Sequence, residues 1–286
     1  MLLTHANEFG WSVDNFGASY ADSTFGTSVN AHASTAHTKG TAVSLIAGAS
    51  VTEDVYGIHI TFGGTLAIGI GADRKFLADL LIDPAGGTSW STLINNLFVY
   101  KPDFSKGGTG YYFPIYLKAG TSIGLQQQCN TANTTMRCAV RLFGKPSRPD
   151  LVKVGRKVET FGATTASTTG TAVTPGTQSL GSYSSLGTTS GDLWWWQCAG
   201  FGWTDTTIQT DNAHYVDVAC GDASNKKLCI HHLRQYASDL EFTAKDSFGM
   251  CPPIRHIKGG ETVYVRAANF GGSNTSPTTI VYGLGG

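Results

Sequence analysis

An internal repeat is the feature of this sequence that most constrains its fold. Short motifs from the first half return in the second half in the same order, at a separation of about 140 residues. Each match is weak alone, but a shared order is what duplication of a domain produces. The clearest pairs are Phe16-Gly17-Ala18 with Phe161-Gly162-Ala163, Gly26-Thr27-Ser28-Val29 with Gly170-Thr171-Ala172-Val173, and Ile94-Asn95-Asn96-Leu97 with Ile230-His231-His232-Leu233.

The repeat predicts two domains. In a chain of 286 residues, each half is long enough to bury a core of its own. The first copy closes on the apolar run Val140–Phe143, and Lys145–Pro149 then combines prolines with charged residues, as stiff linkers do. We therefore expect one domain at 1–145, a linker at 146–149 and a second domain at 150–286.

Composition and local pattern favour short strands. Glycine contributes 36 residues and charged residues only 14%, a mix suited to turns and poorly suited to long helices. β-branched and aromatic runs bounded by Gly, Asn or Asp predict the strands. The fold class we expect is all-β, with two tandem jelly-roll-like β-sandwich domains that arose by internal duplication. The expected strands are 42–46, 56–62, 76–82, 93–100, 122–127 and 137–143, then 193–199, 215–219, 228–233, 262–267 and 278–282, whereas 19–40 and 164–190 are loops or edge strands.

Charge and hydropathy exclude several classes of partner. Lys plus Arg and Asp plus Glu both number 20, so the net charge is zero, and an electrostatic nucleic-acid binder would need an excess of cations. No apolar run approaches the ~20 residues of a membrane span. The N-terminal segment has neither the basic region nor the apolar core of a signal peptide. We expect synthesis in the cytoplasm, and neither nucleic acid nor membrane as a partner.

We find no catalytic motif and expect no cofactor. There is no GxSxG elbow, and no cysteine–histidine pair has a recognisable context. Several acids recur in both copies beside Gly or Pro, where an Asp side chain usually caps a turn. We therefore expect no catalytic residue and a chain that is not an enzyme. The acids that paired-carboxylate hydrolysis would have to use are Asp54, Asp79, Asp83, Asp192, Asp217, Asp222, Asp239 and Glu241.

The pair His231-His232 suggests a metal site. Neighbours on a regular strand point to opposite faces, so the two imidazoles should not share an ion. The first copy has Asn95-Asn96 at these positions, which indicates a polar role. No zinc-type spacing of Cys or His is present. We expect no metal.

A run of three tryptophans is the most distinctive motif. Trp194 and Trp196 share one strand face, which the repeat equates with Tyr56 and Ile58 and hence with core. Trp195 lies on the other face, where the first copy has Gly57. Three interpretations are open for the run. All three rings can pack in the core or between domains, Trp195 can contact a partner protein, or the exposed aromatic surface can form a sugar-stacking platform.

The cysteines suggest disulfides. Cys129 and Cys138 flank one short segment between expected strands, and Cys220 and Cys229 flank another with the same spacing. If each segment is a hairpin loop, each pair can form a disulfide across it. Cys251 precedes two prolines in an extended segment, so it is the candidate for a bond to another chain. The alternative remains open that all six cysteines are reduced and act as small hydrophobic residues.

Motifs of the first copy resemble a class of virion-associated proteins of tailed bacteriophages. They are Gly26-Thr27-Ser28-Val29, Thr38-Lys39-Gly40, Asp54-Val55-Tyr56-Gly57-Ile58, Tyr111-Tyr112-Phe113-Pro114-Ile115, Ala119-Gly120 and Val140-Arg141-Leu142-Phe143-Gly144. The second copy lacks the Thr-Lys-Gly and Tyr-Tyr-Phe-Pro elements. The resemblance implies a structural part of a virion, of the collar, neck, tail-accessory or capsid-decoration type.

Three functions follow as expectations. The first is a virion component that assembles with copies of itself and other virion proteins. The second is a receptor- or glycan-binding adhesion module of a tail or fibre, which should expose clustered aromatic rings beside amides or acids. The third is a hydrolase with an unrecognised site, whose titratable groups should converge and differ between copies.

Overall fold

The computed structural model describes most of the chain, as a β protein in two compact units, Met1–Val158 and Glu159–Gly286. The predicted linker at 146–149 precedes this division. The reason is that Gly155 still belongs to the first unit, where it pairs with Ile115 and donates to the carbonyl of Pro114. The described residues are 11–14, 26–63, 75–100, 109–146, 154–162, 170–203, 212–237, 256–269 and 277–286.

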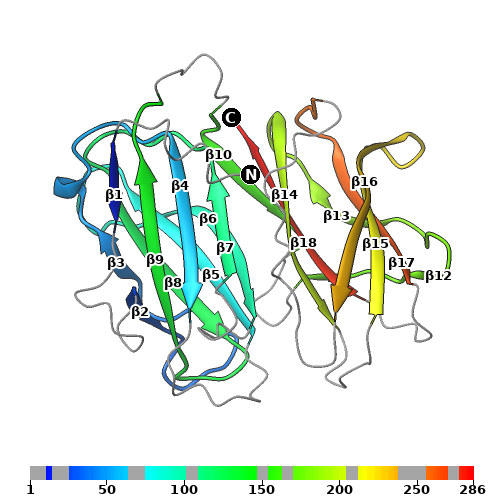
Figure 1. Ribbon diagram of the computed structural model, residues 1–286, viewed down its shortest axis with the longest axis horizontal. Helices are drawn as coiled ribbons and strands as arrows, with labels where there is room; N and C mark the ends of the chain where they lie inside the picture. The colour runs from blue at the N-terminus through cyan, green and yellow to red at the C-terminus, as the bar shows by residue number, and fades with distance from the viewer. Residues whose placement is uncertain are drawn as a thin grey trace. The chain divides into compact units, whose positions relative to one another are not determined.

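The first unit contains two antiparallel sheets (Figure 1). A 5-stranded sheet has the order β1-β9-β4-β7, with β2 also paired to β9, and a 4-stranded sheet has the order β3-β8-β5-β6. The short segment Gly48–Ser50 is a 3₁₀ turn. The strands are β1 (Ser12–Asp14), β2 (Thr27–Asn30), β3 (Val43–Ile46), β4 (Gly57–Gly63), β5 (Lys75–Asp83), β6 (Ser91–Tyr100), β7 (Thr109–Phe113), β8 (Ser122–Cys129) and β9 (Thr135–Phe143).

The second unit also contains two sheets. In the 4-stranded sheet, β18 pairs with β10, β11 and β14, and the 5-stranded sheet has the order β12-β17-β15-β16, with β13 also on β17. β12 pairs with β17 in parallel, whereas the pairs of β11 and β14 with β18, of β13 and β15 with β17, and of β15 with β16 are antiparallel. The strands are β10 (Lys157–Phe161), β11 (Thr171–Ala172), β12 (Gly176–Thr177), β13 (Ser184–Thr188), β14 (Leu193–Trp203), β15 (Asn212–Gly221), β16 (Lys226–Ala237), β17 (Thr262–Asn269) and β18 (Pro277–Gly285).

The two units share one topology in the strands that both copies have, although among the described strands β7 occurs only in the first unit and β12 only in the second. The closing strand, β9 or β18, pairs with the first two strands of its copy and with β4 or β14, and the order β3-β8-β5-β6 returns as β13-β17-β15-β16. The turns match too, because Gly120 and Gly260 both have positive φ, 84° and 89°, and donate to the equivalent carbonyls of Val51 and Thr189. The all-β fold class with internal duplication is confirmed.

Alternation along the strands builds each core. In β17, the inward residues Val263, Val265 and Ala267 are fully buried, and Thr262, Tyr264 and Arg266 between them are partly exposed, which is the period-2 pattern of a sheet with one buried face. The core of the second unit joins residues of both its sheets, such as Val281 of β18 and Val216 of β15. The expected strands are all present, and the uncertain segments 19–40 and 164–190 contain the short strands β2, β11, β12 and β13. Within the described residues, no helix is long and apolar enough to cross a bilayer.

Candidate functional site

Each unit places one aspartate in the middle of a sheet, on the face turned away from its core. Asp79 of β5 is opposite Gln126 of β8, and Asp217 of β15 is opposite Arg266 of β17. These positions are equivalent in the repeat. Both carboxylates are nearly inaccessible, with 6% and 0% of the residue exposed. A buried carboxylate requires hydrogen bonds or a cation, so its partners define the site.

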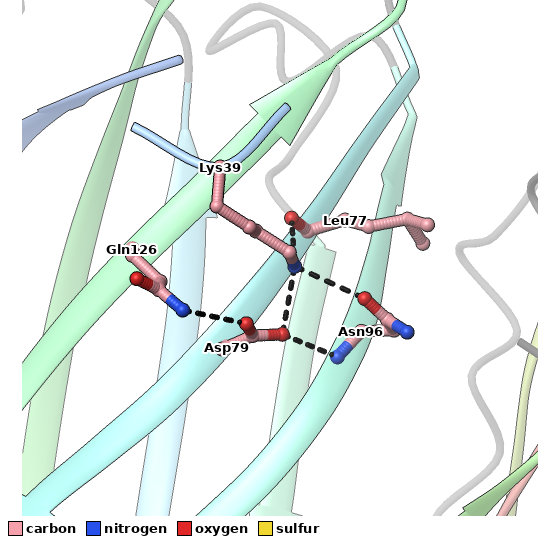
Figure 2. Close-up of polar contacts among 5 residues, drawn as sticks. All are labelled: Lys39, Leu77, Asp79, Asn96 and Gln126. Atoms are coloured by element: carbon pink, nitrogen blue, oxygen red, sulfur yellow. Dashed lines mark hydrogen bonds and ion pairs between the residues drawn. The ribbon is translucent and has the colours of Figure 1, made fainter. Parts of the chain in front are cut away.

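In the first unit, the partner of Asp79 is the ammonium group of Lys39 (Figure 2). Lys39 Nζ lies 2.7 Å from Asp79 Oδ1, 2.9 Å from the carbonyl oxygen of Leu77 and 3.0 Å from Asn96 Oδ1. Gln126 Nε2 donates to Asp79 Oδ2 at 2.9 Å. Burial lowers the pKa of Lys39, and the neighbouring Asp79 offsets part of that effect. Three oxygen atoms thus hold one cation on the sheet face.

A β-bulge in the adjacent strand completes the carboxylate's shell. Asn96 has a positive φ of 52°, at the point where the pairing of β5 with β6 shifts register. Its backbone N–H donates to Asp79 Oδ1 at 2.8 Å. The second unit repeats this arrangement, because His232 has a φ of 51° and its N–H donates to Asp217 Oδ1 at the same distance. The carboxylate caps an N–H group that the bulge removes from the strand ladder.

The cation differs between the copies. Arg266 donates from both Nε and Nη2 to Asp217 Oδ2, at 3.0 and 2.8 Å, from the strand position that Gln126 has in the first copy. At the position of Lys39 the second copy has Leu180. This equivalence follows from the backbone, because Gly40 and Gly181, the next residues, donate to equivalent carbonyls of β8 and β17.

The bulge overturns the expectation that His231 and His232 point apart. Two residues of β16 face one residue of β15 there, and both histidines are exposed on the outer face, with ring centroids 3.8 Å apart. His232 Nδ1 lies 3.8 Å from Asp217 Oδ1. One ligand atom from each of Asp217, His231 and His232 falls within 4.8 Å of the others. The expectation of regular alternation was wrong at this position.

The same face of the second unit carries a cluster of rings and cations. Tyr183 and Tyr264 pack edge to face, with centroids 6.3 Å apart. Arg266 Cζ lies 4.5 Å from the centroid of Tyr183, and Lys226 Nζ lies 4.8 Å from that of Tyr264. We call these four residues the ring–cation cluster. All four are partly exposed.

The disulfides expected at Cys129–Cys138 and Cys220–Cys229 are not formed, and all four cysteines are buried thiols. Cys129 ends β8 and Cys138 lies in β9, which belong to different sheets, so the segment between them is no hairpin. β15 and β16 do form a hairpin, but Lys227 lies opposite Cys220. A diagonal pair such as Cys220 and Cys229 is too far apart for a bond.

Other expected residues divide into two groups. Asp54 and Asp192 accept hydrogen bonds from the N–H groups of Ala119 and Gly259, so they cap equivalent turns. The backbone of Trp195 pairs with Leu284 in the β14–β18 ladder, but its side chain lies outside the described residues. Cys251, Asp239 and Glu241 also lie outside them.

Sequence reasoning missed the contact between Lys39 and Asp79. The available signal was an acid at one repeat position in the interior of a strand in both copies, Asp79 and Asp217. An aspartate inside a strand is unusual enough to require a partner. The identity of the partner could not follow, because it lies in a different segment of each copy.

Comparison with known proteins finds only distant similarity. No protein-family model matches the sequence, and no curated protein matches it. Among solved structures, PNGase F, a glycosylasparaginase from Flavobacterium meningosepticum, is 9% identical with a TM-score of 0.38, over 96% of each chain. The CBM22-1–CBM22-2 tandem domain of Paenibacillus barcinonensis Xyn10C is 10% identical with a TM-score of 0.26, over 96% of this chain and 91% of that one. The cowpea mosaic virus top component is 9% identical with a TM-score of 0.38, over 94% and 90%.

These matches correct one expectation. We expected a chain that is not an enzyme, but the similar structures include a glycosylasparaginase, so that expectation is withdrawn. Because the identities and TM-scores are low, no activity, substrate or residue role of these proteins is assigned to this chain.

Proposed function

We propose that this chain is a structural component of a tailed-phage virion, which acts by docking its β-sandwich faces against copies of itself or other virion proteins. Two features support the proposal. Motifs of the first copy resemble virion-associated proteins, and the chain consists of two copies of one jelly-roll-like sandwich. Duplicated sandwiches offer broad sheet faces, and such faces suit lateral packing in an assembly.

The observation that carries the proposal is the ring–cation cluster on the outer face of the second unit. From the strand registers, the first copy has Ala42, Gly124 and Gln126 where the second has Tyr183, Tyr264 and Arg266. Tyr and Arg are enriched at protein–protein interfaces. At these three positions the second copy has therefore gained residue types that make contact energy, whereas at the fourth position, Lys226, the first copy has Trp90, whose ring lies against Gly124.

The cluster favours a protein partner over a sugar. A sugar-stacking platform presents open ring faces, but here Arg266 lies over Tyr183 and Lys226 lies over Tyr264. Rings and cations already stacked together form a preorganised surface, which loses little side-chain entropy on contact with a partner. A protein surface with acidic side chains complements it.

Sedimentation of the purified full chain tests this proposal. We expect self-association in the micromolar range, and a loss of at least about tenfold in Tyr183→Ala, which installs the residue of the first copy. Asn95→Ala changes an exposed residue on the equivalent face of the first copy and should leave association unchanged. Thermal unfolding verifies that both variants fold.

Two results would contradict the proposal. The first is a chain that remains monomeric at every concentration tested and that binds no other virion protein. Binding on a glycan array that Tyr183→Ala abolishes would instead assign this face to a sugar.

A further inference from the structure

We infer that the second copy carries a binding site for a divalent transition-metal ion such as Zn²⁺, with Asp217, His231 and His232 as its ligands. Two imidazoles and one carboxylate are a donor set that such ions prefer. The inference rests on two independent observations, namely the geometry of the bulge and the cation that occupies the equivalent place in the first copy.

The bulge brings the three side chains together. It directs His231 and His232 to the outer face, directly over the carboxylate of Asp217. His232 is 44% exposed at its side chain and Asp217 is fully buried, so an ion can reach the imidazoles from solvent while the carboxylate lies beneath. The ligand atoms lie within 4.8 Å of one another, which is wider than the separations around a bound ion, so the inference requires the two exposed imidazoles to rotate toward Asp217 on binding.

The first copy shows that this place on the sheet holds a cation. There, Asp79 Oδ1 accepts hydrogen bonds from both Asn96 N and Lys39 Nζ. In the described part of the second copy, Asp217 Oδ1 accepts only the equivalent backbone bond, from His232 N, because Leu180 replaces the lysine. The second copy thus keeps the carboxylate oxygen and lacks the ammonium group.

The side chain at the bulge changes in the matching direction. Asn96 offers an amide oxygen, which suits an ammonium group, and His232 offers an imidazole nitrogen, which suits a transition metal. Asn95 likewise becomes His231. Arg266 binds only the other oxygen, Asp217 Oδ2, so it orients the carboxylate and leaves Oδ1 directed to the histidines.

Titration of the tag-free full chain with Co²⁺ and Zn²⁺ tests the inference. We expect one ion per chain, with Co²⁺ absorption bands typical of nitrogen and oxygen ligands. His231→Ala and His232→Ala should each weaken binding at least about tenfold. Leu180→Lys should abolish binding in a folded protein, because it restores the ammonium group of the first copy beside Asp217 Oδ1.

His256→Ala provides the matched control. His256 is also exposed and lies beside an acid, with Nε2 3.4 Å from Asp192 Oδ2, but it belongs to no cluster of three ligands among the described residues. We expect it to bind Zn²⁺ like the unmodified chain. The inference is overturned if the chain binds neither ion, if the His231 and His232 variants bind with unchanged affinity, or if Leu180→Lys binds as well as the unmodified chain.

Discussion

His214 should make the second unit sensitive to mild acid, and His214→Phe should remove that sensitivity. His214 lies in β15 with 3% of the residue exposed, and burial lowers its pKa to about 4. The repeat supplies the replacement. Its equivalent in the first copy is Phe76, which is fully buried and lies opposite Cys129 as His214 lies opposite Asn269.

The sign and the size follow from the pKa. The unfolded chain binds a proton near pH 6.5, but the folded chain resists protonation until about pH 4, so the stability present above pH 6.5 is lost as the pH falls. At about 1.4 kcal/mol per pH unit, the loss is about 2 kcal/mol at pH 5 and approaches about 3 kcal/mol at pH 4. Phenylalanine does not titrate, so the variant lacks this dependence.

Urea unfolding at pH 7 and pH 5 measures the effect. The comparison is the pH-dependent change in the free energy of unfolding of the second unit, before and after substitution, so that other groups cancel. The pKa of His59, for example, is lowered by burial and by Arg141, but this effect is the same in the unmodified chain and in His214→Phe, so it cancels in the comparison. His256→Gln, at an exposed site, should keep the full dependence. An identical pH dependence in the unmodified chain and in His214→Phe would refute the reasoning.

Three further predictions concern the first unit. Asp79→Ala should lower the free energy of unfolding by roughly 3 kcal/mol, because it removes the anionic partner of the Lys39 ammonium and an acceptor of the Gln126 amide and of the bulge N–H of Asn96. Urea unfolding checks this, with the exposed Glu53→Ala as control. Gly120→Ala should cost about 1 kcal/mol by the same assay, through its positive φ alone, since no atom lies within 4 Å of the added methyl group. Burial raises the pKa of the Cys138 thiol, so this thiol should react with a thiol reagent only after unfolding. Peptide mapping that finds Cys138 labelled in the native chain would contradict its buried placement.

The sequence alone predicted the fold class because its signals are local. Alternating β-branched and aromatic residues, and glycines at turns such as Gly120 and Gly260, act within a few residues, so they indicate each strand. Duplication could also be inferred, because the order of motifs survives even where each motif has changed. The turn acids beside Pro84 and Gly221 belong to the same local class, because Asp83 accepts from Ala85 N and Asp222 from Ser224 N.

Only the tertiary structure decided which residues meet. The segment after Cys129 crosses to the other sheet instead of forming a hairpin, and a single extra residue in β16 brings His231 and His232 to one face. Lys39, which lies before β3, reaches Asp79 of β5 although 40 residues separate them in the sequence. Strand propensity carries no information on strand order, register or bulges, because these are fixed by the joint packing of both sheets, and the candidate metal site depends on all three.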